Sequence, residues 1–186
     1  MNDNIVLNHE GTVPKLKVGL SWYHNEQKAG VLDTSVVPHN LDLTCAVIGQ
    51  DKKVLELISP HAPKRSKYKE QIFHMGDHLS GGSDFEDEEI VVSLDKVSED
   101  IHALVFVVSV NGKVTFSDVK NAALEFMDGI TLDSFLSFDF LGAEKAALMC
   151  GLLVRDGNGW LLQSVREDIA AVDETLIQES LKAILK

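Results

Sequence analysis

The sequence predicts a mainly β protein, built as a two-sheet β-sandwich with few short helices and a C-terminal amphipathic helix. Short apolar stretches recur along the 186 residues and are separated by Gly, Asn, Asp or Pro, which is the spacing of strands joined by turns. The length suits one core, so we expect a single domain over residues 1–186. Strands are expected in KVGLSWY, DLTCAVIG, KVLELIS, EIVVSL, ALVFVVSV, SFLSFDFLG, ALMCGLLV and WLLQSV.

Two of these stretches indicate how the sheets are buried. In DLTCAVI, the apolar residues Leu43 and Cys45 share one face, while Asp42 lies on the other. This alternation is typical of a half-buried strand, so we expect Asp42 to point away from the core. Residues 103–110 are apolar at nearly every position, which predicts a strand covered on both faces near the centre of a sheet.

Turn residues predict one hairpin and one further turn, and one segment fits either a helix or a strand. Residues 156–159, Asp-Gly-Asn-Gly, supply the positive φ angles of tight turns and predict a hairpin between the stretches on either side. The Asn-Gly pair at 111–112 predicts another turn. The segment 116–127 fits either a short helix capped by Ser117 or a strand with alternating apolar residues.

The C-terminal residues follow a helical pattern. Asp and Glu precede the apolar positions and Lys follows them, which suits the helix dipole at both ends. We predict an amphipathic helix from about residue 173, within a helical extension that covers 167–186. Its apolar face either docks on the sandwich or contacts a partner protein. The apolar residues of the pattern are Val172, Leu176, Ile177, Leu181 and Ile184.

The charge balance excludes some classes of partner. The chain has 29 Asp and Glu against 17 Lys and Arg, a formal net charge of -12, which repels nucleic acid phosphates and anionic lipid surfaces. Cations are the expected partners. No apolar run approaches the length of a membrane span, and the N-terminus lacks the pattern of a signal peptide. We therefore expect a cytoplasmic protein with no membrane insertion.

The cysteines and the basic cluster have ordinary interpretations. Cys45 and Cys150 lie in apolar runs, where a thiol usually behaves as a small buried hydrophobe; a disulfide between facing strands is the alternative. The basic cluster at 60–69 is expected to be a solvated surface loop, with contact to a partner as the alternative.

The segment 76–89, GDHLSGGSDFEDEE, concentrates carboxylates. It holds six of them and contains no Lys or Arg. Crowded carboxylates repel one another unless a cation relieves them, and calcium accepts many oxygens at flexible angles. The segment therefore predicts a calcium site, with an inert solvated loop as the alternative. Its carboxylates are those of Asp77, Asp84, Glu86, Asp87, Glu88 and Glu89.

Two other metal sites fit this segment less well. Zinc prefers sulfur or imidazole ligands, and although His74 and His78 are four residues apart, Gly76 between them disfavours a shared helical face. The residue register of an EF-hand loop is absent.

Five segments stand in a consistent order between about residue 15 and residue 166. They are Gly19-Leu20-Ser21-Trp22, Asn40-Leu41-Asp42-Leu43, Gly76-Asp77-His78-Leu79-Ser80-Gly81, Glu86-Asp87-Glu88 and Gly157-Asn158-Gly159-Trp160. Together they resemble the TerD-like tellurium-resistance family, which has G-L-G-W, D-L-D, G-D-N-L-T-G, D-D-E and G-x-W at these places. The predicted terminal helix lies beyond this pattern.

The resemblance implies a two-sheet β-sandwich that holds calcium in its acidic loops, and a strand rather than a helix at 123–127. Three departures bear on the calcium site: Asn40 and Glu86 each stand where the family has Asp, and His78 stands where it has Asn. The charge lost at position 40 should weaken calcium affinity, and if the family holds two ions, one site is lost. The candidate ligands are Asp42, Asp77, Glu86, Asp87, Glu88, Asp84 and Asn40.

Three functions compete. The first is a calcium-binding, non-catalytic module of a tellurite or other stress response that acts by docking on other proteins. The second is a metal-free interaction scaffold that uses the terminal helix or the 60–69 loop. The third is a metal-dependent hydrolase, which the absence of G-x-S-x-G, P-loop and H-E-x-x-H motifs disfavours. We therefore expect no enzymatic activity.

Overall fold

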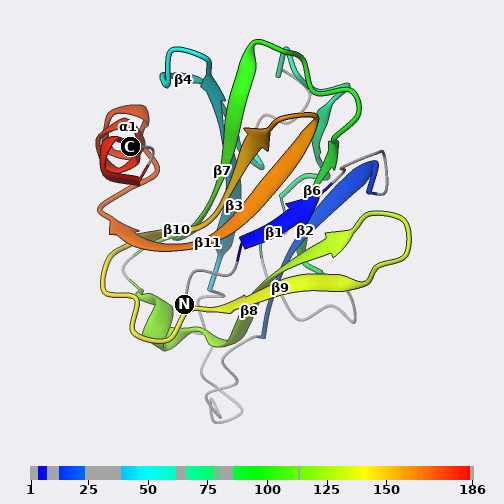
Figure 1. Ribbon diagram of the computed structural model, residues 1–186. Helices are drawn as coiled ribbons and strands as arrows, with labels where there is room; N and C mark the ends of the chain where they lie inside the picture. Colours follow the sequence, from blue (N-terminus) through cyan, green and yellow to red (C-terminus); the bar gives the residue numbers. More distant parts are fainter. Residues whose placement is uncertain are drawn as a thin grey trace, which may run out of the picture.

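The described residues form two antiparallel β-sheets packed face to face, with one α-helix on the outer side of the larger sheet (Figure 1). The computed structural model describes residues 4–7, 13–23, 39–61, 66–77, 79, 86–112 and 114–184. The predicted mainly β sandwich is confirmed. Within the described segments, no helix is long and apolar enough to cross a membrane.

The larger sheet has six strands in the order β1-β11-β10-β7-β3-β4. The strand predicted at 103–110 is β7, and it lies in the middle of this sheet as expected. The predicted hairpin is also present, because Asp156 of β10 pairs with Gly159 of β11 and Gly157 has a φ angle of +56°. The strands are β1 (Asn4–Leu7), β3 (Leu41–Gly49), β4 (Val54–Ile58), β7 (Ile101–Val110), β10 (Ala147–Asp156) and β11 (Gly159–Ile169).

The smaller sheet has five strands in the order β5-β6-β2-β8-β9. The segment that fits either a helix or a strand forms β8, as the family resemblance implied, after a single turn of 3-10 helix, η3 (Phe116–Asp118). The alternative, a short helix capped by Ser117, is not formed: Ser117 lies inside η3, and Asp118 accepts hydrogen bonds from the N–H and hydroxyl of Thr115. The strands are β2 (Lys15–Tyr23), β5 (Ile72–His74), β6 (Glu88–Ser93), β8 (Lys120–Asp128) and β9 (Ser134–Asp139).

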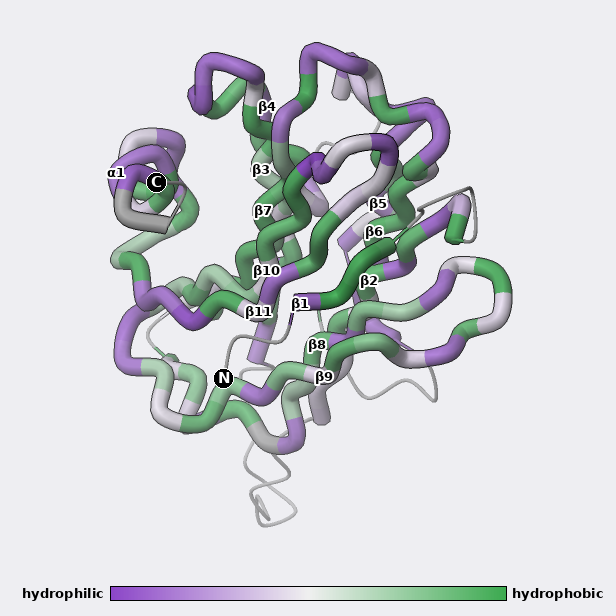
Figure 2. Tube along the Cα trace, viewed as in Figure 1, coloured by the Kyte–Doolittle hydropathy of each residue, from purple (hydrophilic) through white to green (hydrophobic). Residues whose placement is uncertain are grey.

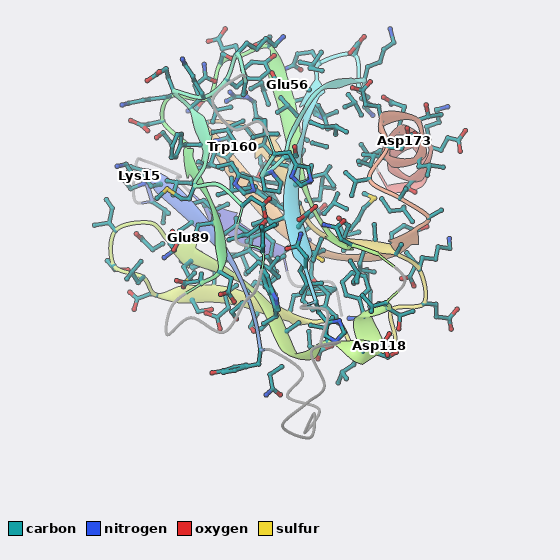
Figure 3. The ribbon with its side chains drawn as sticks, turned by 180° about the vertical axis from the view of Figure 1, so that it is seen from behind. Lys15, Glu56, Glu89, Asp118, Trp160 and Asp173 are labelled. Atoms are coloured by element: carbon teal, nitrogen blue, oxygen red, sulfur yellow. The ribbon has the colours of Figure 1, made fainter. Side chains whose placement is uncertain are left out.

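The main core fills the space between the two sheets and is built from buried apolar side chains of both. Figure 2 shows that much of the trace of these strands has the colour of hydrophobic residues. Trp160 of β11 is 1% exposed and lies among these side chains when the molecule is viewed from behind (Figure 3). The guanidinium of Arg155 stacks over its ring at 4.4 Å and donates to the carbonyl oxygens of Ser98 and Ile101. Both cysteines are buried and free, so the buried-thiol prediction is confirmed.

A second apolar cluster lies on the outer face of the larger sheet, beneath helix α1 (Glu174–Ile184). Ile177 and Leu181 are buried there, so the predicted helix docks on the sandwich. The Gln178 side chain also contacts the edge strand: its Oε1 accepts from the N–H of Val54 at 2.9 Å, and its Nε2 donates to the carbonyl of Lys52. The expected start of the extension at 167 is too early, because β11 continues to Ile169.

This cover explains why β3 differs from the prediction. Every residue of β3 is buried, although its alternating sequence predicted one exposed face. The apolar residues on its outer side, Ala46 and Ile48, lie in the cluster under α1. Asp42 does face away from the main core, but it is only 5% exposed. A strand whose sequence predicts one exposed face is therefore fully buried, because a helix far away in the sequence covers the outer side of its sheet.

Candidate metal centre

The candidate site forms where β3 extends beyond its neighbour β4. The two strands pair only from Cys45 onward, so the backbone of Leu43 on that side has no partner strand. Buried backbone groups need hydrogen bonds, and two side chains of the other sheet provide them. Oε2 of Glu88 accepts from the N–H of Leu43 at 2.7 Å, and Nε2 of His74 lies 2.8 Å from the Leu43 carbonyl oxygen.

Hydrogen bonds and burial define the tautomer and the charge of His74. Its Nδ1 accepts a hydrogen bond from the N–H of Gly76 at 3.0 Å, so the proton is on Nε2, which donates to Leu43. The ring is fully buried, and desolvation lowers its pKa below the ordinary value despite the carbonyl contact. A neutral imidazole with both nitrogens occupied has no lone pair left for zinc.

Three of the predicted ligands converge at this edge. Ligand oxygens of Asp42, Asp77 and Glu88 all lie within 4.8 Å of one another. Asp42 comes from β3, Asp77 follows β5, and Glu88 begins β6. Asp42 and Glu88 are 5% and 1% exposed, whereas Asp77 is the solvent-exposed member of the group. Solvent therefore reaches this group through Asp77.

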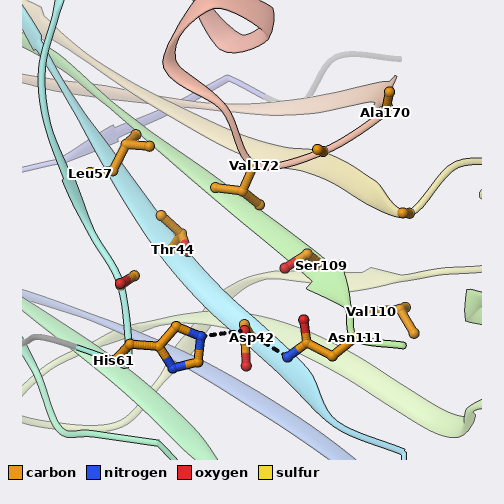
Figure 4. A pocket seen from close by; sticks show the side chains of 12 residues that line it. Asp42, Thr44, Leu57, His61, Ser109, Val110, Asn111, Ala170 and Val172 are labelled. Atoms are coloured by element: carbon orange, nitrogen blue, oxygen red, sulfur yellow. Dashed lines mark hydrogen bonds and ion pairs between the residues drawn. The ribbon is translucent and has the colours of Figure 1, made fainter. Parts of the chain in front are cut away.

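Hydrogen-bond donors surround Asp42. The side-chain amide of Asn40 donates to Oδ1 at 3.1 Å, and that of Asn111 donates to Oδ2 at 2.8 Å. His61 lies between two carboxylates: its Nε2 is 3.3 Å from Oδ2 of Asp42, and its Nδ1 is 3.5 Å from Oδ2 of Asp77. Figure 4 shows Asp42 between His61 and Asn111. The imidazole of His61 is 61% exposed.

The other acidic candidates lie apart from this group. Glu86 forms an ion pair with Lys17 at 3.2 Å, and Glu89 forms another with the same ammonium at 3.2 Å. Oδ2 of Asp87 accepts from the N–H of Trp22 at 3.0 Å and so joins the start of β6 to β2. The acidic segment thus has a cationic neighbour after all, because sheet pairing brings Lys17 beside it.

Two candidate ligands remain, Asp84 and Asn40. Asp84 lies outside the described residues, as do His78, Gly81 and Gly82. Asn40 is next to the group through its hydrogen bond to Asp42. Its Oδ1 atom is buried and has no hydrogen-bond partner within the described part of the chain.

Sequence reasoning missed His61 and Asn111. His61 falls in the basic cluster that predicts a surface loop, and Asn111 falls in a turn signal. The pairing of Asp42 with Ser109 in the β3–β7 ladder brings Asn111 beside the carboxylate. No local pattern at either position marks such a contact, since both depend on strands that meet only in the folded chain.

The chain matches the TerD domain over residues 2–178 and belongs to this family. The resemblance seen between residues 15 and 166 is thereby confirmed. The match is longer than expected, however, because it includes the first part of α1.

The relatives agree with this assignment. The chain is 24% identical over 184 residues to the tellurium resistance protein TerX of Serratia marcescens, with 86% of each chain covered. It is 32% identical over 100 residues to the stress response protein SCP2 of Bacillus subtilis, with 50% of each covered. The crystal structure of a TerD homologue from Streptomyces coelicolor A3(2) superposes with a TM-score of 0.70 at 21% identity, covering 89% of this chain and 95% of that one. At this identity, the likeness shows the fold.

Proposed function

We propose that this protein is a calcium-binding, non-catalytic module that acts in a stress response through protein partners. The observation that carries the proposal is the convergence of Asp42, Asp77 and Glu88, whose oxygens lie within 4.8 Å of one another. These residues come from three separate segments, so only the folded chain brings them together. Glu88 also connects the two sheets at this edge through its hydrogen bond to the N–H of Leu43, and a cation held by all three carboxylates would add a second link.

The donor set suits calcium. All three side chains offer hard oxygen ligands, and Oδ1 of Asn40, buried without a partner in the described residues, is a further oxygen beside Asp42. Calcium accepts carboxylates, amide carbonyls and waters at flexible angles, whereas magnesium needs near-ideal octahedral geometry. A bound divalent cation would also relieve the repulsion among three carboxylates.

Two observations support a non-catalytic protein, and the relatives support a role in stress. Cys45 and Cys150 are fully buried, and burial raises the pKa of both thiols far above the ordinary value, so neither forms a reactive thiolate. The ring of His74 has both nitrogens in hydrogen bonds, which removes it as a general base. The stress role rests on the relatives, which are named for tellurium resistance and stress response.

One observation favours the metal-free scaffold as a second candidate. The imidazole of His61 reaches Asp42 and Asp77 at once. When protonated, it supplies positive charge between two carboxylates without a metal ion. In that case the site is a structural clamp, and calcium has little effect on the protein.

A calcium titration of the metal-stripped protein separates the two candidates. We expect calcium to raise the unfolding temperature strongly and magnesium to raise it little, because an ion that binds only the folded state stabilises it by about 2.7 kcal/mol at a hundredfold excess over Kd. Asp77→Asn should weaken calcium binding at least about tenfold, since it removes one charged ligand.

Glu86→Gln is the matched control. It removes the same charge from the same acidic segment, but Glu86 pairs with Lys17 outside the three-carboxylate group. Calcium affinity should therefore stay within about twofold of the unmodified protein. Equal weakening by both variants, or no response to millimolar calcium, would favour the scaffold.

The stress role needs a separate test in cells. A strain that lacks this gene should lose tolerance to tellurite or to another stress and regain it with the unmodified gene. The Asp77→Asn gene should restore less tolerance than the Glu86→Gln gene. Full rescue by Asp77→Asn would show that calcium binding is not needed for the role.

A further inference from the structure

The outer face of the larger sheet has an apolar half and a polar half. Helix α1 covers the apolar half through Ile177 and Leu181. The polar half lies toward the other end of β3 and β7, where Asp42, Thr44 and Ser109 share the face. The strand ladder pairs Asp42 directly with Ser109. This half lies beside the segment 170–172 that leads into α1, and it contains a cavity.

The cavity has a volume of about 390 Å³, which falls within the usual range for small-molecule sites. Figure 4 shows its lining, with polar groups of β3 and β7 on one side and Leu57 and Val172 on the other. Thr44 is 2% exposed, so the floor of the cavity is well removed from bulk solvent. The full lining is Asp42, Thr44, Leu57, Ser59, His61, Ser109, Val110, Asn111, Ala146, Ala170, Ala171 and Val172.

The lining selects a ligand by charge. Among the described residues that form it, none is Lys or Arg, and Asp42 is the single carboxylate. An anion would therefore meet the buried negative charge of Asp42. The ring of His61, which also lines the cavity, already lies between Asp42 and Asp77, so binding of an anion is unfavourable. Hydroxyls of Thr44, Ser59 and Ser109 add acceptors near the carboxylate, while Leu57 and Val172 provide an apolar wall.

Asp42 retains capacity for a further hydrogen bond. A carboxylate has about four acceptor positions, and the described contacts of Asp42 are the amides of Asn40 and Asn111 and the ring of His61. Hydrogen bonds between two ionised groups are the strong ones. We infer that the cavity binds a small organic cation, with a primary ammonium on Asp42 and a short aliphatic body against Leu57 and Val172.

This inference goes beyond calcium binding and does not depend on it. Asp42 belongs to both sites, so calcium and the ammonium compete for one carboxylate. Asp77 and Glu88 do not line the cavity, and Val172 is not part of the carboxylate group. Each site thus has a residue that changes it without touching the other.

The first experiment uses n-butylamine as the probe, added to the isotopically labelled full chain in a buffer with a calcium chelator. Amide NMR signals of Thr44, Ser109, Asn111 and Val172 should shift in a saturable way. Butyrate should cause no such shifts, and n-butanol should bind about tenfold more weakly or worse, because it lacks the charge that strengthens the contact with Asp42.

Variants then separate the sources of binding. Asp42→Asn should weaken butylamine binding by about tenfold or more, and Val172→Phe should weaken it by filling the apolar side. Asp95→Asn, an equal charge change in the exposed turn after β6, should leave butylamine binding unchanged. Asp77→Asn should preserve butylamine binding while it weakens calcium binding, so the two proposals fail separately.

Several outcomes would overturn the inference. They are absence of saturable shifts at the cavity, equal binding of butanol, binding of butyrate, or full binding by Val172→Phe. A lysine side chain of another protein carries the same ammonium, so N-acetyl-lysine methylamide is tested in parallel. Binding of that compound without binding of butylamine would reject a small free amine as the ligand. If Asp42→Asn does not fold, the inference is still tested by comparing the binding of butylamine, butanol and butyrate and by the Val172→Phe variant.

Discussion

Asn40→Asp gives a prediction in which the size of the stability loss depends on calcium. In the metal-free protein, the amide of Asn40 donates to Asp42 at 3.1 Å. A carboxylate at this position has no proton to donate and repels Asp42 instead. A hydrogen bond to a charged group contributes about 1.5–3 kcal/mol. Including partial relief of the repulsion by solvent, we expect the metal-free protein to lose about 2–3 kcal/mol of stability.

Calcium should reverse part of this loss. A further carboxylate beside Asp42 offers the ion another charged oxygen, and we expect the affinity to rise about tenfold, equivalent to about 1.4 kcal/mol. At saturating calcium, this gain adds to the stability of the folded state. The variant should therefore be clearly less stable than the unmodified protein in a chelator, and closer to it in calcium.

Thermal unfolding in both conditions provides the assay, with calorimetric titration for the affinity. For a chain of this length, about 1 kcal/mol corresponds to about 2–4 °C, so a loss of about 2–3 kcal/mol should lower the unfolding temperature in a chelator by about 4–12 °C. Asn158→Asp, in the exposed turn between β10 and β11, is the matched control and should change neither the unfolding temperature nor the calcium affinity by much. An equal deficit with and without calcium would refute the reasoning, because it would mean that position 40 does not contact the ion.

Two more predictions concern the rest of the fold. Gly151→Ala places a Cβ 2.4 Å from the ring of Phe126, so overpacking should lower the stability of the fold by about 1–3 kcal/mol. Combining it with Phe126→Leu, which removes the ring, should recover part of this loss. If urea unfolding shows that the double variant loses the sum of the two single losses, the clash is refuted. Burial lowers the pKa of His74, so the unfolded chain binds this proton more readily and stability is lost as pH falls below the unfolded value of about 6.5. His74→Gln should flatten that dependence in metal-free protein, and an unchanged pH profile would show that another group controls it.

The acidic segment shows how far local sequence reaches. Its composition predicts a cation site, and the family resemblance selects the right region. Among the described residues of this segment, the structure nevertheless brings together only Asp77 and Glu88 with Asp42. Glu86 and Asp87 are adjacent in sequence but bind Lys17 and the backbone of Trp22. Side chains alternate across a strand, so neighbours in sequence point to different partners.

The partners of the site depend on strand pairing. Asn111 reaches Asp42 because β3 and β7 pair antiparallel, and His61 follows an edge strand that ends short of the site. Neither the residue types nor their spacing in the sequence predicts which residues of these strands pair. The cavity beside Asp42 depends on still more, because its wall includes the segment leading into α1.

The sequence by itself determined the sandwich, the central strand at 103–110, the hairpin at 156–159, the terminal helix and the family. These features depend on local periodicity, turn residues and ordered motifs, which are properties of neighbouring residues. Tertiary structure alone decided that β3 is buried on both faces, which acidic residues converge, and where a cavity remains. Those results require residues far apart in the chain to pack against one another, and the free energy of that packing depends on all of them together.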